Sequence, residues 1–165
     1  QRTYILIKKN SVVRNPCVFE EANDFLSQPW HYSIDGSLQL TEYNFSRRPV
    51  AVRAEVEIDS KMEPIFFFGV HIKSKHVTNG EAMWKNGTNA EKEEFILESI
   101  RNRRKIAAEC GRLRKCLTEV VFEKNTNPMI IVSGDMNDGP GMDFFQDHYL
   151  LFDSVNLLTG NTFHR

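Results

Sequence analysis

The fold of this chain is decided by the stretch MIIVSGDMNDGPG, residues 129–141. Its first five residues carry no charge and run into a glycine, a pattern typical of a strand covered on both faces. Asp135 then stands at the carboxyl end of this strand, and Asn137 follows two residues later on the same side. The glycines and proline of residues 139–141 turn the backbone directly afterwards. A carboxylate and an amide at the edge of a rigid sheet are suited to bind a metal, a water or a phosphate. The simpler alternative is that Asp135 and Asn137 only shape a polar turn, as these residue types often do.

A second buried strand is predicted over residues 65–72, which read IFFFGVHI. Between the two strands, residues 90–122 place apolar side chains at spacings of three, four and six, which predicts a long amphipathic helix. Strand, helix and strand in this order form a crossover unit with parallel strands, whose carboxyl ends share one edge of the sheet. We therefore expect His71 and Asp135 in one cleft, although they lie far apart in sequence. Arg103 falls near the apolar stripe of the helix, and we expect its guanidinium to point outward.

The remaining segments give weaker signals. Residues 2–7 alternate as a strand does, residues 14–36 contain breakers and read as irregular, and residues 77–90 read as a polar loop. Residues 50–58 alternate cleanly, which predicts a half-buried antiparallel strand. Residues 142–148 are expected to form a short amphipathic helix that buries Phe144 and Phe145.

Composition bounds the class of protein. The chain has 165 residues, of which 41% are apolar and 26% charged, as expected for one globular domain. A net charge of −1 gives no global attraction to nucleic acid or to a membrane. No apolar run is long enough for a transmembrane segment. Three cysteines lack metal-ligand spacing, and we expect them to be small buried residues. Localisation and oligomeric state stay open.

Three stretches together resemble the endonuclease/exonuclease/phosphatase superfamily, the group of the pancreatic deoxyribonucleases, abasic-site nucleases and sphingomyelinases. Residues 70–74, VHIKS, are similar to the His-Leu-Lys-Ser strand of that family. Residues 133–138, SGDMND, resemble its Gly-Asp-Phe-Asn-Asp strand end, with Met136 in place of Phe. Residues 45–49, FSRRP, resemble its Phe-x-Arg-x-Pro motif before a strand. The resemblance implies part of a four-layer α/β sandwich with two mixed sheets and a long crossover helix.

The resemblance also implies a reaction and a set of roles. It predicts a hydrolase of phosphodiester or phosphomonoester bonds that depends on Mg²⁺ or Mn²⁺ and acts on a nucleic acid, a phospholipid head group or a small phosphoester. Asp135 would orient the attacking water or assist the metal, His71 would donate to the phosphate, and Asn137 would hold a phosphoryl oxygen or the nucleophile. Arg47 would clamp the substrate phosphate, and Lys73, on a basic rim, would bind it as well. Arg47 and Arg48 could equally be a solvated surface pair.

The departures from the family pattern matter as well. The resemblance implies an Asn and a metal-binding Glu on earlier strands and a late Asp-His pair, and the sequence shows neither. We therefore expect residues 1–165 to be one such domain, incomplete at both ends, with activity belonging to a longer parent and little in this stretch alone. The alternative function is a catalytically inactive member of the fold that serves as a binding module. A plain α/β interaction domain is the third and weaker alternative.

Overall fold

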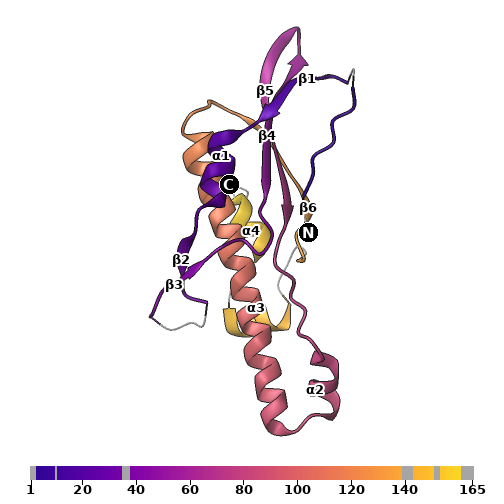
Figure 1. Ribbon diagram of the computed structural model, residues 1–165, viewed down its shortest axis with the longest axis vertical. Coiled ribbons are helices and arrows are strands. Elements are labelled where there is room, and N and C mark those ends of the chain that lie inside the picture. Colours follow the sequence, from indigo (N-terminus) through magenta and orange to yellow (C-terminus); the bar gives the residue numbers. More distant parts are fainter. Residues whose placement is uncertain (1–2, 10, 35–37, 139–142, 151–152, 161–165) are drawn as a thin grey trace.

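The computed structural model describes residues 3–9, 11–34, 38–138, 143–150 and 153–160. It has an α/β architecture, in which helices pack beside a four-stranded sheet of order β1-β4-β5-β6 and a two-stranded sheet pairs β2 with β3 (Figure 1). The elements in chain order are β1 (Val13–Val18), α1 (Glu20–Ser27), β2 (Trp30–Tyr32), β3 (Thr41–Tyr43), β4 (Val50–Ile58), β5 (Lys61–His71), α2 (Gly80–Asn86), α3 (Asn89–Cys116), the π-helix η1 (Leu117–Phe122), β6 (Met129–Asp135), the π-helix η2 (Gln146–Leu150) and α4 (Ser154–Thr159).

The predicted crossover unit is confirmed. Strands β5 and β6 pair in parallel, so that Phe68 lies opposite Val132 and His71 opposite Asp135. Strand β4 pairs antiparallel with β5 through a tight hairpin at Asp59 and Ser60, which have φ angles of 49° and 62°. Two successive positive φ angles match the twist that a two-residue hairpin needs. The sheet is therefore mixed. Among the described strands, the parallel pair is β5 and β6, and the stretches VHIKS and SGDMND begin near the carboxyl ends of these two strands.

Helix α3 connects the parallel strands and packs on one face of the sheet together with α1 (Figure 1). It begins at a capping box in which the Thr88 side chain accepts from the Glu91 N–H and Glu91 accepts from the Thr88 N–H. This exchange satisfies two amide groups that would otherwise lack partners at the helix start. The main core lies between α3 and the sheet, and includes Phe66, Phe68, Val70, Ile106, Cys110, Leu113 and Leu117.

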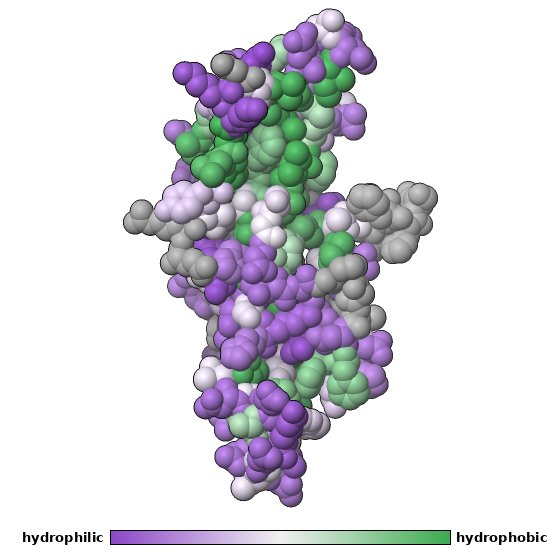
Figure 2. Space-filling model, turned by 90° about the vertical axis from the view of Figure 1, so that its right-hand side faces the viewer, coloured by the Kyte–Doolittle hydropathy of each residue, from purple (hydrophilic) through white to green (hydrophobic). Residues whose placement is uncertain are grey.

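The second face of the sheet is largely open among the described residues, which corrects the expectation that β6 is covered on both faces. Alternate residues of β4, β5 and β6 point away from α3, because side chains along a strand alternate between faces. Ile58 and Ile131 on this face remain 43% and 45% exposed. Thr3 and Ile5 lie over Gly69 on the same side. Figure 2 views the molecule from this direction and shows hydrophobic side chains gathered over the sheet.

Several local predictions were wrong. Residues 3–7 form no strand, and the segment read as irregular contains β1, α1 and β2. Pro16 does not prevent β1, because β1 is an edge strand whose register shifts between Arg14 and Cys17. The loop predicted over residues 77–90 contains α2. The helix predicted over residues 142–148 is observed from residue 144, and residue 142 lies outside the described residues. Phe144 is 60% exposed, so the expectation that its side chain is buried was wrong.

Among the helices that the structure describes, none is both long and apolar enough to cross a membrane.

Candidate active site

The candidate site begins at Gly134, the last residue of β6 before Asp135. Its φ angle is 140°, a conformation that residues with a Cβ rarely adopt. A Cβ at this position would lie 1.9 Å from the carbonyl oxygen of Val70 on the neighbouring strand. Glycine therefore lets β6 stay paired with β5 up to the residue that carries the candidate carboxylate.

His71 and Asp135 lie side by side at the carboxyl edge of the parallel pair, as predicted. They are opposite each other in the strand register, and His71 Nε2 is 3.7 Å from Asp135 Oδ2. The side chain of Asp135 is 59% exposed, whereas that of His71 is 22% exposed. A partly buried imidazole beside a solvent-facing carboxylate can present a hydrogen-bond donor and a negative charge to the same small molecule.

Asn137 and Arg47 meet at one backbone carbonyl next to this pair. Asn137 Nδ2 donates to the Ile72 oxygen over 2.7 Å, and Arg47 Nη1 lies 3.3 Å from the same oxygen. The Asn137 N–H also donates to Asp135 Oδ1 over 2.9 Å, and Asn137 has a φ angle of 50°, which asparagine tolerates better than most residues. One Asn137 amide hydrogen and its carbonyl oxygen are not used in the Ile72 contact. The structure thus brings together four of the five residues that the sequence singled out.

Lys73 is the exception. Its backbone N–H donates to Glu109 Oε2 on α3 over 2.8 Å, and its side chain lines a surface cavity beside α3 with His76, Asn102 and Lys105. Lys73 is therefore placed against the helix, whereas His71 and Asp135 face each other at the end of the sheet.

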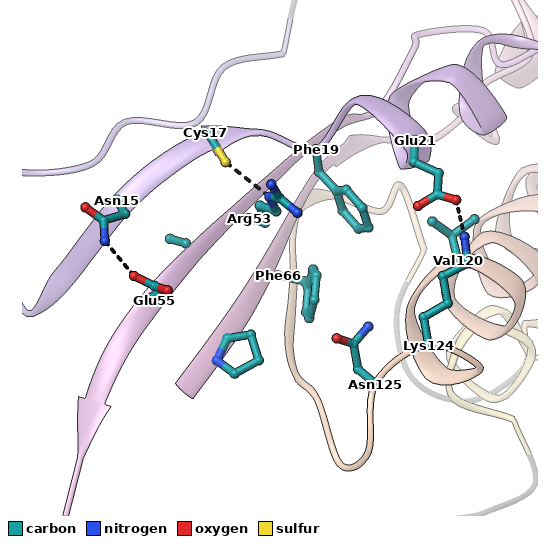
Figure 3. Close-up of a pocket in the computed structure, with 12 residues that line it drawn as sticks. Asn15, Cys17, Phe19, Glu21, Arg53, Glu55, Phe66, Val120, Lys124 and Asn125 are labelled. Atoms are coloured by element: carbon teal, nitrogen blue, oxygen red, sulfur yellow. Dashed lines mark hydrogen bonds and ion pairs between the residues drawn. The ribbon is translucent and has the colours of Figure 1, made fainter. Parts of the chain in front are cut away.

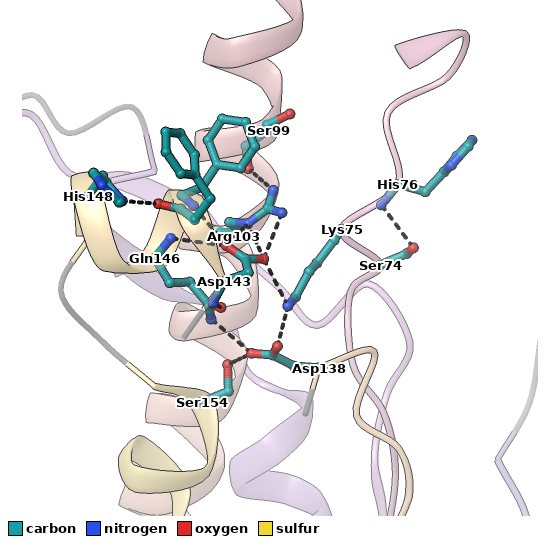
Figure 4. Close-up of polar contacts among 12 residues, drawn as sticks. Ser74, Lys75, His76, Ser99, Arg103, Asp138, Asp143, Gln146, His148 and Ser154 are labelled. Carbon is teal, nitrogen blue, oxygen red and sulfur yellow. Dashed lines mark hydrogen bonds and ion pairs between the residues drawn. The ribbon is translucent and has the colours of Figure 1, made fainter. Parts of the chain in front are cut away.

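A charged network joins Asp138, next to the site, to Asp143 and α3, and sequence reasoning missed it (Figure 4). Arg103 Nε lies 3.1 and 2.9 Å from the two oxygens of Asp143, and its Nη2 lies 2.8 Å from Oδ2. Lys75 bridges Asp143 and Asp138. The Arg103 side chain is only 10% exposed, so the expectation that its guanidinium points outward was wrong. The reason is that a buried guanidinium is tolerated when a carboxylate pairs with it in this two-pronged geometry.

The network changes the acidity of both carboxyl groups. Burial raises the pKa of Asp143, but hydrogen bonds from Arg103, the Gln146 N–H and Lys75 outweigh burial and hold that pKa well below its usual range. Burial likewise raises the pKa of Asp138, and hydrogen bonds from Lys75, Ser154 and Gln146 lower it overall. Both groups therefore remain carboxylates in mildly acidic solution. Asp138 is the last residue of the SGDMND stretch, so the sequence already indicated a structural or functional role for it.

Glu109 is a second residue that sequence reasoning missed. It is fully buried in α3, and its carboxylate accepts from Tyr43 Oη over 3.0 Å and from the N–H groups of Ser46 and Lys73 over 2.8 Å each. Burial raises the pKa of Tyr43, and the Glu109 charge raises it further. The available signal was a charged residue three positions after Ile106, inside the apolar stripe of the helix.

The donor set at the candidate site suits a metal ion only in an open arrangement. Among the described residues, no group of three or more His, Cys, Asp or Glu side chains could enclose an ion. Asp135 supplies one carboxylate, and Mg²⁺ often binds through one or two carboxylates together with substrate phosphates. Asp135 is the residue that would hold Mg²⁺ or Mn²⁺ here, and the ion would neutralise charge on the phosphoryl group.

Another cavity lies away from these residues, lined by parts of β1, β4, η1 and the amino-terminal half of β5 (Figure 3). It has a volume of 530 Å³ and a floor of Phe19, Phe66 and Val120. Cys17 is exposed at its wall, 3.2 Å from Arg53 Nε, so the expectation that all three cysteines are buried was wrong. Open α/β sheets bind ligands at the carboxyl ends of their strands, so we assign the candidate chemistry to His71 and Asp135.

Comparison with known proteins adds no relative: no protein-family model, curated protein or solved structure gives a significant match to the chain.

Proposed function

We propose that the protein belongs to a metal-dependent hydrolase of phosphodiester or phosphomonoester bonds, of the endonuclease/exonuclease/phosphatase type. The observation that carries this proposal is the pairing of His71 with Asp135 at the carboxyl edge of the parallel strands, next to Asn137 and Arg47, which both contact the Ile72 carbonyl. These four side chains supply a carboxylate, an imidazole, an amide and a guanidinium. Hydrolysis of a phosphate ester needs a positioned water and donors for the developing charge, which is what this combination offers.

We assign the roles that the resemblance predicts. Asp135 is the most exposed of the group, and it orients or deprotonates the attacking water or holds the metal ion. His71 donates to a phosphoryl oxygen. The second amide hydrogen of Asn137 and the guanidinium of Arg47 hold the phosphate in place. The substrate is a nucleic acid, a phospholipid head group or a small phosphoester.

We further propose the four-layer sandwich with two mixed sheets as the full architecture. The second face of the sheet carries apolar side chains such as Val52, Phe67 and Ile131, which supports a further layer on that side.

The substitution Asp135→Asn tests the reaction in the complete protein. Against plasmid DNA, sphingomyelin, inositol phosphates and bis(p-nitrophenyl) phosphate, we expect Mg²⁺-dependent release of product that Asp135→Asn lowers about 100-fold or more. Its melting temperature should hardly change, because the side chain is mainly exposed. Asp59→Asn is the matched control, since it makes the same chemical change in the β4–β5 turn at the other end of the sheet.

Equal rates for Asp135→Asn and the parent protein would remove Asp135 from the mechanism. Tight binding of a phosphate ester without turnover would favour instead the inactive binding module. The observation behind that alternative is the single carboxylate at the site.

A further inference from the structure

A cavity of 370 Å³ lies between the segment that follows β5 and one side of α3. The wall formed by that segment is fixed to the helix at two points. The Lys73 N–H donates to Glu109 over 2.8 Å, and the side chain of Asn102, itself 3% exposed, donates to the His76 carbonyl over 3.0 Å. The cavity is lined by Lys73, His76, Val77, Thr78, Met83, Glu94, Glu98, Asn102 and Lys105.

Two lysines face this cavity without a counter-ion. Lys73 and Lys105 are both half-buried, and within the described ranges neither ammonium forms an ion pair with a carboxylate. Figure 4 shows that His76 points away from the Lys75 network. Two half-buried ammonium groups that share one cavity favour the binding of an anion there.

The opposite end of the cavity carries the reverse charge. Glu94 and Glu98 stand one turn apart on α3, and Glu94 precedes Lys105 by about 16 Å along the helix axis. Glu98 is paired with Arg101 over 2.7 Å, whereas Glu94 is exposed. A long polyanion that bound the two lysines and continued along α3 would therefore be repelled by these carboxylates. The cavity suits one compact anionic group.

The cavity is also close to the candidate active site. Lys73 follows His71 by two residues, so their Cα atoms are at most about 7 Å apart. A compact ester with two phosphate groups is about as long as this separation.

We propose that this cavity is a subsite for a second phosphate group on a compact substrate, with Lys73 and Lys105 as its ligands. The inference rests on the proposed function and narrows its substrate to small esters that carry a phosphate besides the scissile one. It also gives Lys73 a role different from the one expected from sequence, since Lys73 binds the second phosphate while Arg47 stays beside the first.

The test measures binding of inorganic pyrophosphate to the 165-residue chain by calorimetry and by amide chemical shifts. We expect pyrophosphate to shift the signals of residues 73–78 and 102–105, and Lys73→Gln or Lys105→Gln to weaken its binding about tenfold each. Lys115→Gln is the matched control, because this lysine is on the same helix but pairs with Glu119. Shifts that avoid these residues, or equal affinity in all three variants, would overturn the subsite.

A second measurement separates the substrate classes. A single-stranded oligonucleotide should bind more weakly than pyrophosphate, and Glu94→Gln combined with Glu98→Gln should raise the affinity of the oligonucleotide. If the unsubstituted chain binds the oligonucleotide more tightly than pyrophosphate, the cavity serves nucleic acid, and the inference of a compact substrate is overturned. Asp135→Asn should leave pyrophosphate binding at this cavity intact, so failure of the proposed reaction and failure of this subsite are distinguishable.

Discussion

At the scale of single residues, two carboxylates that follow β6, Asp138 and Asp143, accept hydrogen bonds from several elements. Asp143 accepts from Arg103 and Lys75 and also from the backbone N–H groups of Phe145 and Gln146. Asp138 lies beside it with its side chain only 2% exposed, bonded to Lys75, Gln146 and Ser154. These bonds hold Asp138, the residue that immediately follows Asn137. The network therefore supports the backbone next to the candidate site.

This network predicts how stability depends on pH. The folded pKa of Asp143 is depressed below the unfolded value of about 3.9, so the unfolded state binds more protons in acid. Its contribution is complete above about pH 4 and is lost as the pH falls through the folded pKa. We expect Asp143→Asn to cost about 2 kcal/mol at pH 7 and to flatten the loss of stability between about pH 4 and 2.

Urea unfolding at a series of pH values measures both effects. Asp147→Asn is the matched control, because the Asp147 side chain is 59% exposed and lies outside the network. If the free energy of unfolding falls equally steeply below about pH 4 in Asp143→Asn and in the unsubstituted chain, Asp143 is not the group responsible.

At the scale of elements, Glu109 joins α3 to two segments that carry candidate residues. One segment leads through Ser46 to Arg47, and the other follows β5 at Lys73. A buried carboxylate with three donors is stable in place, whereas removal of its charge leaves donors without a partner. Glu109 thus holds the helix, the β3–β4 connection and the end of β5 in register.

We expect Glu109→Gln to destabilise the fold by about 2 kcal/mol or more, because the amide Nε2 would face a backbone N–H in place of an acceptor. Glu119→Gln should cost at most about 0.5 kcal/mol, since Glu119 forms a surface pair with Lys115 in the same helical region. Denaturant unfolding of the two variants makes the comparison. Similar losses in both would show that Glu109 does not hold these segments together.

At the scale of the whole molecule, the sheet has two apolar faces, and among the described residues only one of them packs against helices. Val50, Val52, Ala54, Val56 and Ile58 all lie on the face away from α3, which is why their strict alternation was so clear in sequence. An exposed apolar surface of this kind marks a contact site or a tendency to associate.

We therefore expect the isolated 165-residue chain to self-associate through this face. Ile131→Lys should weaken association about tenfold or more, because a charge would have to be buried in the contact. Leu97→Lys on α3, where the side chain is 54% exposed, is the matched control. Sedimentation velocity at several concentrations measures the effect. Association that responds equally to both substitutions would place the contact elsewhere.

The sequence by itself determined the centre of the fold. Uncharged runs at residues 65–72 and 129–134, with a periodic helix between them, predicted β5, α3 and β6 and their parallel pairing. The meeting of His71 and Asp135 followed, because right-handed crossover connections leave parallel strands ending at one edge. These features depend on hydrophobic periodicity, which short stretches of sequence show, and on the handedness that all chains of L-amino acids share.

Only the tertiary structure decided which surfaces were covered and where long side chains pointed. Arg103 turns inward because Asp143 is brought to it from 40 residues away, and Lys73 faces α3 because Glu109 holds its backbone. Strand β1 forms in a segment rich in breakers because β4 offers it an edge to pair with. Each outcome depends on a partner distant in sequence, and the free energy of a buried charge or a strand edge is set by that partner rather than by neighbouring residues.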